Sequence, residues 1–467
     1  MIEEALAGSR IASAVWAVVD MDGDGSSPLL GGGDCDDLNA EIGPSRAEDP
    51  GNGVDEDCDG LDEILLHPSF RATYQTDPAK VQALVASTRK NPTVVLLIDA
   101  LRHDRVPDER FPNLARLSGE GVSFSRAYAT SSSTASSLPA MATGVLRPRT
   151  VDLNFAERLA KGGKTSAMVV LDVVLDTIEG KVNTWGNLHY PFRRGFSHVE
   201  IVKTPQKKKG WGGGIRHFTG TEITDRVFAL LDGPEPPDLI WAHYFDVHQW
   251  NMLKLDDPKL KGAKAYDAIL ERLDAEIGRI LSRADRLNLV LVSDHGECIG
   301  DHGKKFHTKY LYRELVQVPL VFRIPGQTPF VVEAPVSLTG LSHTLVAMAG
   351  IPLPEAQASL NLLGLAGNAE PGVGPPIAMF DKVHWGLVQD EWRLIYTPKS
   401  GAKQLFHVVD DPEERKNLAD AEPEQTEDMM QMLKAVRAAT ERYRTSDLRQ
   451  ARTQAQEKKA KARAKAN

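Results

Sequence analysis

The sequence predicts an α/β protein, a three-layer α/β/α sandwich on a mostly parallel sheet, followed by a small C-terminal antiparallel β subdomain. Short and mostly apolar runs recur along the middle of the chain, and they cover residues 93–98, 165–171, 238–244, 288–293 and 318–324. Such runs are typical of strands buried on both faces of a parallel sheet. Stretches with helical spacing of apolar residues lie between them, which is the pattern of βαβ units.

Composition supports a globular protein and argues against two partner classes. The chain has 467 residues, of which 42% are hydrophobic and 25% charged, so it is long enough for one large α/β domain with appendages. The formal net charge of −9 and the lack of an aromatic-basic surface argue against a nucleic-acid partner. No apolar run reaches the length of a transmembrane helix. The early apolar stretch Ile11–Val19 follows two acidic residues and is a poor signal peptide.

The chain divides into six segments by composition. We expect an N-terminal lead, an acidic Cys-containing segment, a linker, the main α/β domain, a C-terminal subdomain with a helix, and a basic tail. These segments cover residues 1–19, 20–63, 64–91, 92–352, 353–445 and 446–467.

The acidic segment reads DMDGDG, GGGDCDDLN and NGVDEDCDG, with carboxylates at alternate positions and glycines that allow tight turns. This spacing suits oxygen ligation of calcium. The candidate ligands are Asp20, Asp22, Asp24, Asp34, Asp36, Asp37, Asp55, Asp57 and Asp59. The segment has too few apolar residues for its own core, so calcium and a Cys35–Cys58 bridge would supply its stability. The alternative is a disordered acidic linker.

The two cysteines also bear on location. A bridge between Cys35 and Cys58 implies an oxidising compartment, so we expect an extracytoplasmic protein, periplasmic or at the cell surface, although no signal peptide is visible. Cys298 is left over and is interpreted as a small buried residue.

The main domain begins with the strand 93–98, which Asp99 ends. A short helix and a strand follow, and then a run of hydroxyl residues, TSSSTASSLPAMATG, leads into a small-residue helix. A hydroxyl at a helix start can cap the helix or, beside a metal, act as a nucleophile. Further helices are expected at residues 173–179, 222–231, 266–284 and 341–349.

Polar side chains follow three of the predicted strands. Asp99, Asp246 with His248, and Asp294 with His295 each come just after an apolar run. Open α/β sheets bind ligands beyond the carboxyl ends of their strands, so these side chains are expected to converge. Asp and imidazole together suit a divalent metal with borderline ligand preference. The alternative for the last loop is a solvated polar stretch.

Beyond residue 352 the sequence indicates a small β-rich unit. Residues 378–397 are expected to form two antiparallel strands separated by a turn, with Trp385 and Trp392 as packing residues. A last strand near residue 405 and a helix over 425–443 follow. The basic, Ala-rich tail is expected to be solvated.

Several of these stretches resemble the sulfatase-like branch of the alkaline phosphatase superfamily. They include VVLLIDALRHD, FPNLARLSGEGVSFSRAYA, SSSTASSLPAMATG, WAHYFDVH, SDHGECIGDHGKKFHTKYLYREL and QLFHVVDDPEERKNL, in the family's order. The resemblance implies an α/β/α sandwich, a divalent-metal site, and attack of an enzyme nucleophile on a phosphate or sulfate ester. The acidic segment similarly resembles thrombospondin-like calcium modules of bacterial surface proteins, which implies export.

Carried over residue by residue, the resemblance implies specific roles. The implied metal ligands are Asp99, Thr134, Asp294 and His295, and the metal is zinc, manganese, magnesium or calcium. The implied catalytic residues are Thr134 as nucleophile, His248 and His307. The implied substrate-binding residues are Asp246, His302, Lys305 and Lys309.

The sequence departs from the formylglycine sulfatases at three positions. Thr134 occupies the nucleophile position, and Leu138 stands where those enzymes have Arg; Ala100 follows Asp99 where many have a second Asp. A Thr nucleophile with Asp and His ligands resembles the phosphatases, phosphodiesterases and phospho-group transferases of this superfamily, which implies a phosphate ester, or less favourably a sulfate ester, as substrate. Attack would form a phospho-threonine, and water or a second alcohol would complete hydrolysis or transfer.

Two alternatives remain open. One is a transferase acting on a lipid or glycan, held at a membrane by an anchor upstream of Met1. The other is a catalytically degenerate domain that serves as a calcium-stabilised surface binding protein. The expected substrate is a small-molecule, lipid or glycan ester.

Overall fold

The structure is a computed structural model. It describes residues 20–23, 25–27, 34–43, 46, 56, 58, 78–179, 190–204, 217–253, 257, 259–307, 309–353, 361–366, 375–441 and 443. The chain forms two compact units: one comprises residues 72–433, and the other comprises residues 1–71 together with 434–467.

The larger unit is built on an eight-stranded sheet with the strand order β10-β2-β9-β7-β1-β6-β4-β5. The strands are β1 (Thr93–Ile98), β2 (Val122–Phe124), β4 (Ser166–Leu171), β5 (His198–Val202), β6 (Leu239–Tyr244), β7 (Asn288–Val292), β9 (Leu320–Arg323) and β10 (Phe330–Val332). From β7 to β5 all neighbours are parallel, whereas β9 is antiparallel to both β7 and β2. The described part of the connection from β7 to β9 contains the short 3-10 helix η6 (Asp301–Gly303), the four-residue helix α10 (Arg313–Val316) and the strand β8 (Gln317–Val318), but no long crossover helix.

The central strands are buried on both faces, as their uninterrupted apolar sequences predict. Every residue of β1, β4, β6 and β7 is buried. A second, three-stranded sheet of short strands lies in the order β11-β3-β8, with β3 at Ala127–Tyr128, β8 at Gln317–Val318 and β11 at Val336–Ser337.

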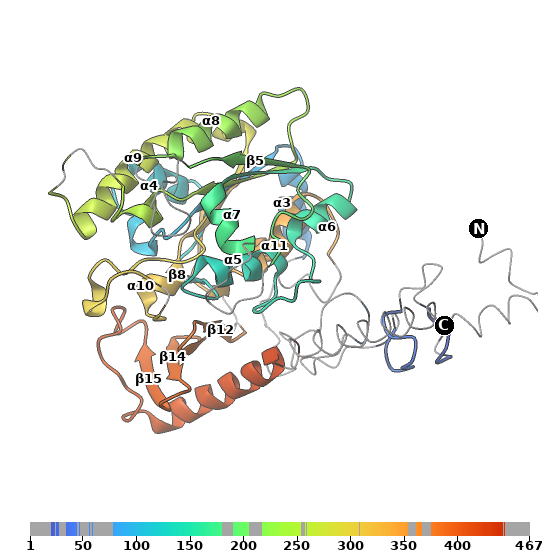
Figure 1. Cartoon of the computed structure of the whole chain (residues 1–467), viewed down its shortest axis with the longest axis vertical. Coiled ribbons are helices and arrows are strands. Elements are labelled where there is room, and N and C mark those ends of the chain that lie inside the picture. Colours follow the sequence, from blue (N-terminus) through green and yellow to red (C-terminus); the bar gives the residue numbers. More distant parts are fainter. Residues whose placement is uncertain are drawn as a thin grey trace, which may run out of the picture. The chain divides into compact units, whose positions relative to one another are not determined.

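Helices cover the sheet in two groups (Figure 1). One group packs α4 (Pro112–Gly119) and α8 (Gly220–Leu231) against α9 (Ala263–Leu281). In the other, α11 (Gly340–Met348) contacts three helices of the same layer, α3 (Pro78–Thr88), α5 (Thr134–Thr143) and α6 (Phe155–Lys161), while α7 (Asp172–Glu179) packs on α5. Apolar residues at helical spacing explain the buried face of α9, which includes Ile269, Leu273 and Ile277. The predicted three-layer sandwich is confirmed.

The C-terminal subdomain is a four-stranded antiparallel sheet in the order β12-β13-β14-β15. Its strands are β12 (Ile377–Phe380), β13 (Trp385–Gln389), β14 (Trp392–Thr397) and β15 (Ala402–His407), and a helix over residues 423–441 follows. The expectation of two strands over 378–397 was wrong, because three are present. The first break arises at Asp381, whose Oδ1 accepts hydrogen bonds from the backbone amides of Val383 and His384, both at 2.6 Å.

Within the described residues, no helix is both long enough and apolar enough to span a bilayer. The described residues do not include the expected lead at 1–19, the expected tail at 446–467 or the part of the linker that precedes residue 78.

Candidate active site

The sheet register brings two carboxylates together. Strands β1 and β7 are parallel neighbours, and Leu97 is paired with Val292. Asp99 and Asp294 each follow this pair by two residues, so they leave adjacent strands at the same level. Both side chains are fully buried.

Thr134 lies at the first turn of α5, next to these carboxylates. Its Oγ1 donates to Asp99 Oδ2 at 3.3 Å and lies 3.0 Å from His295 Nε2. One turn later, Ser137 Oγ donates to the Asp294 carbonyl at 2.6 Å, which ties the helix to the loop after β7. The hydroxyl of Thr134 therefore points at the carboxylates and not back at its own helix.

The carboxylate oxygens have the surroundings of metal ligands. Among the described residues, Asp99 Oδ1 and both carboxylate oxygens of Asp294 have no hydrogen-bond partner although they are buried. Ligand atoms of Asp99, Asp294 and His295 lie within 4.8 Å of one another. Buried, unpaired carboxylate oxygens this close together are costly unless a cation compensates them, so the residues fit a divalent metal.

A buried histidine that was not among the predicted site residues lies beside Asp99. His243 is on β6, and its Nε2 lies 3.2 Å from Asp99 Oδ2. The available signal was a titratable side chain within an otherwise apolar central strand, LIWAHY. Such a partner orients a metal-binding carboxylate and limits its movement.

A second cluster combines His248, His295 and His307, with ligand atoms within 4.8 Å of one another. His248 Nε2 lies 3.2 Å from His307 Nε2. His307 Nδ1 lies 3.2 Å from Glu297 Oε2, which also accepts a hydrogen bond from Trp250 Nε1 at 3.1 Å. Glu297 therefore fixes the orientation of the His307 ring, as outer carboxylates do for metal-binding histidines.

The loop that carries these residues requires a glycine. At Gly296 an added Cβ would lie 2.0 Å from the carbonyl oxygen of Glu314. The Gly296 amide donates to the Leu315 carbonyl at 2.8 Å, so the loop after β7 packs directly on the segment before β8. No larger residue fits this close approach of two backbones.

The electrostatics of the site follow from burial and mutual charge. Burial would raise the pKa of Asp99, but the nearby His248, His243 and His295 outweigh it and hold that pKa below its usual value. Burial and the charge of Asp99 raise the pKa of Asp294. Burial lowers the pKa of His248 to about 3, which leaves its ring neutral and suited to metal binding.

The pKa of His307 shifts in the direction opposite to that of His248, upward. Burial would lower its pKa, but the charge of Glu297 outweighs burial and raises it. The same contact lowers the pKa of Glu297 against the effect of burial. The two groups form a charge-assisted pair in the wall of the site.

Two of the residues expected to bind substrate, Asp246 and His302, have protein partners outside the set of Thr134, Asp99 and His295. Asp246 is buried, and its Oδ1 accepts a hydrogen bond from the Thr219 amide at 2.5 Å, just before α8. Its contacts are those of a residue that anchors a helix start. His302 stacks on Tyr312 with ring centroids 4.0 Å apart, and its Nδ1 lies 3.0 Å from Glu314.

His302 instead lines a cavity of about 570 Å³. The other lining residues are Arg102, His103, Asp104, Asp301, Arg313, Glu314, Gln317, Pro412, Glu413 and Arg415. Lys305 and Lys309, the two cations expected near the substrate, are exposed and flank His307 in sequence.

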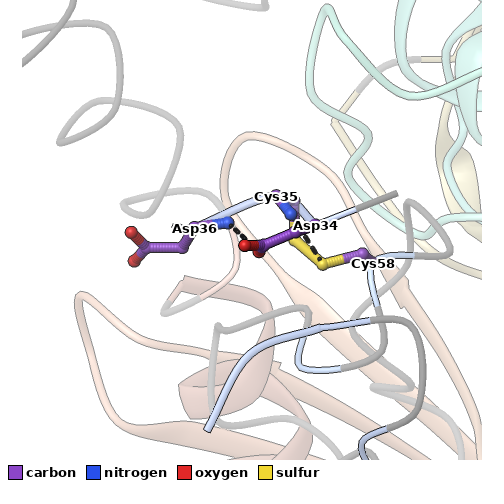
Figure 2. The surroundings of a disulfide bond; sticks show 4 residues. All are labelled: Asp34, Cys35, Asp36 and Cys58. Carbon is purple, nitrogen blue, oxygen red and sulfur yellow. Dashed lines mark hydrogen bonds between the residues drawn. A yellow bond between two sulfur atoms is a disulfide. The ribbon is translucent and has the colours of Figure 1, made fainter. Parts of the chain in front are cut away.

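The acidic segment contains the expected disulfide. Cys35 and Cys58 are bonded, with a Cα–Cα distance of 5.6 Å, and the Cys35 amide donates to Cys58 Sγ at 3.0 Å (Figure 2). Asp34 Oδ1 accepts a hydrogen bond from the Asp36 amide at 2.9 Å, which closes a tight turn beside the disulfide (Figure 2).

A second turn in this segment forms around Asp20. Its two carboxylate oxygens accept hydrogen bonds from the Gly23 and Gly25 amides at 2.8 and 3.2 Å. Asp37 Oδ1 accepts a hydrogen bond from the Met21 amide at 3.0 Å. Asp22 is half-buried in this turn, and the other expected ligands Asp24, Asp55, Asp57 and Asp59 lie outside the described residues.

The fold and the site define an α/β/α protein with a buried Asp/His/Thr metal-type site at the carboxyl ends of its central strands. Residues 179–351 match the family model described as sulfatase, which supports the resemblance to that family. Residues 34–63 match a family model described as "Putative metal-binding motif".

Curated relatives support this family. Arylsulfatase K of Rattus norvegicus is 29% identical over 206 residues, which cover 39% of this chain and 36% of that protein. Arylsulfatase K of Bos taurus is 28% identical over 261 residues, which cover 50% of this chain and 48% of that protein. The chain thus spans less than half the length of these relatives.

Solved structures show the fold alone. A protein solved in complex with its substrate D-glucosamine-2-N,6-O-disulfate superposes with a TM-score of 0.57 at 15% identity, covering 75% of this chain and 98% of that one. The phosphonate monoester hydrolase of Agrobacterium radiobacter superposes with a TM-score of 0.58 at 15% identity, covering 75% and 96%.

Proposed function

We propose that this protein is a metal-dependent hydrolase or transferase that acts on a phosphate ester, with a sulfate ester as the less favoured substrate, through Thr134. The observation that carries the proposal is the position of Thr134 Oγ1, 3.3 Å from Asp99 Oδ2 and 3.0 Å from His295 Nε2. The hydroxyl shares a buried site with carboxylate oxygens that have no hydrogen-bond partner among the described residues, which is the setting of an activated nucleophile. The similarity to ester hydrolases of the same fold supports this assignment.

The preference for phosphate rests on the chemistry of residue 134. A sulfatase that uses formylglycine oxidises a Cys or Ser side chain to an aldehyde hydrate, and the methyl group on the Thr134 Cβ prevents that product. Leu138, which is buried in α5, provides no guanidinium where those enzymes have Arg. Thr134 would instead attack directly as an alkoxide.

Asp99, Asp294, His295 and Thr134 would hold the metal, and His248 with His307 could hold a second one. A bound divalent cation would lower the pKa of the Thr134 hydroxyl and stabilise charge on the equatorial oxygens of the ester. Three of these six residues, His248, His295 and His307, are imidazoles. The combined donor set therefore favours zinc or manganese over calcium and magnesium.

The protein's own groups complete the chemistry. Helix α5 begins at Thr134, so the positive end of its dipole would stabilise negative charge that develops beside Thr134. His307, oriented by Glu297, would donate a proton to the leaving oxygen or contact the ester anion. A phospho-threonine would form as the alcohol leaves, and water or a second alcohol would release the phosphoryl group.

The test is turnover of aryl phosphate monoester, diester and sulfate by metal-reconstituted protein, with Thr134→Val and Thr134→Ser alongside. Thr134→Val keeps the shape of the side chain without the hydroxyl, and Thr134→Ser keeps the hydroxyl. We expect phosphate turnover that disappears in the first variant and persists in the second. Turnover of sulfate alone, or activity unchanged in Thr134→Val, would contradict the proposal.

Two further outcomes of this experiment separate the alternatives. Phosphoryl transfer to an added alcohol in preference to water would favour a transferase acting on a lipid or glycan acceptor, for which a membrane anchor outside this sequence would be expected. Metal binding without turnover of any ester would favour a catalytically degenerate binding protein. The unpaired carboxylate oxygens of Asp99 and Asp294 argue for an intact metal site in either case.

We also propose that the acidic segment at 20–63 binds calcium and that the protein is extracytoplasmic. The match to a metal-binding motif, the Asp-closed turns at Asp20 and Asp34, and the Cys35–Cys58 disulfide support this assignment. Calcium titration of the full chain by calorimetry, repeated after Asp20→Asn with Asp34→Asn, tests it. Unchanged calcium binding in the double variant would contradict the assignment.

A further inference from the structure

A polar cavity of about 570 Å³ lies beside the connection from β7 to β9. The residues that line it come from three places: the segment after β1, the connection itself and the segment after β15. Among the described residues, this lining does not include Thr134 or the carboxylates and histidines grouped around it. A volume of this size is typical of a small-molecule site, so the cavity is a second candidate site apart from the active site.

The carboxylates in the lining all have cationic partners within the described part of the chain. The ion pairs join Asp104 and Asp301 to Arg102, Asp104 also to Arg105, Glu314 to His302, and Glu413 to Arg415. No carboxylate of the lining is therefore left with an unmatched negative charge that would attract a cation.

His302 carries a positive charge in this arrangement. Its Nδ1 lies 3.0 Å from Glu314 Oε1, and its Nε2 lies 3.3 Å from the carbonyl oxygen of Glu414. Both ring nitrogens face acceptors, and both can donate only when the ring is protonated. Burial would lower the pKa of His302, but the hydrogen bond with Glu314 outweighs burial and raises it. The pair of Glu314 and His302 is therefore neutral as a whole.

Arg313 is the cation of the lining that has no carboxylate partner among the described residues. Its Nε donates to Gln317 Oε1 at 2.6 Å, and its Nη1 donates to the Pro412 carbonyl at 2.8 Å. Both acceptors are neutral, and the side chain is half-buried. A guanidinium in this setting is suited to bind an anion with several oxygen atoms, such as a carboxylate or a phosphate.

His103 supplies an unused hydrogen-bond acceptor to the same cavity. Its Nδ1 is buried and has no partner among the described residues. Burial and the charge of Arg313 lower the pKa of His103, although a hydrogen bond with the Val318 backbone raises it, so the ring is neutral near pH 7. Because that bond favours the protonated ring, it is made by a ring N–H, which leaves Nδ1 as an acceptor. A ligand hydroxyl would satisfy this atom.

We propose that this cavity binds a phosphate group, either free or as the monoester of a small hydroxylated alcohol. Phosphate oxygens would accept hydrogen bonds from the Arg313 guanidinium, and a hydroxyl of the ligand would donate to His103 Nδ1. Free phosphate retains such a hydroxyl near neutral pH, and an ester can supply one from its alcohol. Because the site is separate from Thr134, this inference is independent of the proposed function.

The chemistry of the lining distinguishes phosphate from related anions. Sulfate has a similar shape and charge but no hydrogen atom to donate, so it would leave His103 Nδ1 without a partner. A small hydroxy acid supplies a hydroxyl, but its carboxylate offers Arg313 fewer acceptor oxygens than a phosphate does. The cavity is larger than a single phosphate group, which leaves space for the alcohol part of an ester.

Four probes test the class of ligand by calorimetry on the metal-reconstituted full chain. They are glycerol 3-phosphate, inorganic phosphate, sulfate and glycerate. We expect both phosphates to bind this cavity more tightly than sulfate and glycerate. Tighter binding of glycerol 3-phosphate would identify an ester as the ligand, and equal binding of the two would identify the phosphate group alone. A preference for sulfate or glycerate would overturn the proposal.

The contribution of Arg313 is measured by difference, because the active site also offers a place for anions. Arg313→Gln should weaken binding of both phosphates at the cavity by about tenfold. Arg286→Gln removes an exposed arginine from η5 (Ala284–Arg286), which precedes β7, and is the matched control. It should leave binding unchanged. Binding in Arg313→Gln equal to that of the wild-type protein would overturn the proposal.

The contribution of His103 is measured by the preference between two anions. His103→Gln keeps a side-chain N–H for the Val318 backbone and removes the Nδ1 acceptor. It should lower the preference for phosphate over sulfate by roughly fivefold, whereas Arg313→Gln should weaken both anions alike. An unchanged preference in His103→Gln would contradict the role of its ring.

Metal titration separates this cavity from the active site. Arg313→Gln and His103→Gln should bind metal as tightly as the wild-type protein does. Loss of phosphate binding together with an equal loss of metal affinity would place the anion at the active site and overturn the proposal. Asp294→Asn should instead lower metal affinity and retain a phosphate site that is sensitive to Arg313→Gln. Absence of ester turnover would reject the proposed function without affecting these binding measurements.

Discussion

Replacement of Asp294 by Asn should change the stability of the protein in opposite directions with and without metal. Asp294 is fully buried beside Asp99, and neither of its carboxylate oxygens has a hydrogen-bond partner among the described residues. In metal-free protein the substitution removes a buried charge that no hydrogen bond compensates, while keeping the side-chain shape. We therefore expect Asp294→Asn to raise the free energy of unfolding of chelator-treated protein by roughly 1–3 kcal/mol at pH 7.

The sign of this effect follows from the direction of the pKa shift. The folded state raises the pKa of Asp294, so ionisation of this carboxyl disfavours the folded state as the pH rises through its folded pKa. The gain from Asp294→Asn should therefore be largest at neutral pH and vanish below about pH 4, where both states of the wild-type carboxyl are protonated.

When metal is bound, the wild-type protein should be more stable than Asp294→Asn. Zinc or manganese at 100 times its dissociation constant would stabilise the wild-type protein by about 2.7 kcal/mol, and the Asn variant should lose most of this gain. Thermal unfolding of the wild-type protein and of Asp294→Asn, each in chelator and in excess metal, measures the four stabilities to be compared. The reasoning is refuted if the variant is less stable than wild type in chelator, or if metal stabilises both proteins equally.

Three further changes probe the scaffold of the site. His243→Gln should weaken metal binding about 10- to 100-fold by releasing Asp99, as measured by metal titration, and equal affinity would remove His243 from the site. Gly296→Ala should destabilise the protein by roughly 2–4 kcal/mol in chemical denaturation, because its Cβ would overlap the Glu314 carbonyl; a smaller loss would mean that the loop can shift. His343 is buried and burial lowers its pKa to about 3, so its stabilising contribution is present above pH 6.5 and lost as the pH falls. His343→Leu should reduce the slope of stability against pH between 6.5 and 4 by about 1.4 kcal/mol per pH unit, and an unchanged slope would contradict the shift.

The strands could be predicted from sequence because burial on both faces leaves a local pattern. The apolar run 93–98 became β1 without a shift of either end. The hydroxyl-rich stretch before Gly144 likewise led into a helix, and that helix begins at Thr134. Patterns in the C-terminal unit were harder to interpret, because the turn at Asp381 interrupts an apolar stretch and makes two strands where one was expected.

Pairings across the sheet could not be read from the sequence. Asp246 and Asp294 each come two residues after the end of an apolar strand, yet Asp294 joins Asp99 and Asp246 bonds to Thr219. Which way a side chain points after a strand depends on the loop that follows and on the helix packed against it. His302 stacks on Tyr312, a contact that the sequence did not indicate, and its predicted role in substrate binding stays a prediction.

The sequence by itself determined the fold class, the disulfide between Cys35 and Cys58, and the set of residue types from which a metal site can be built. These features depend on hydrophobic periodicity, on cysteine content and on side-chain chemistry, all of which are local. Only the tertiary structure decided which of the polar residues meet. It brought His243 to Asp99 and His248 to His307, because β6 is the neighbour of β1 and the loop after β7 folds back beside the end of β6. Distances of about 3 Å between residues far apart in the chain follow from strand order and register, which are global properties of the fold.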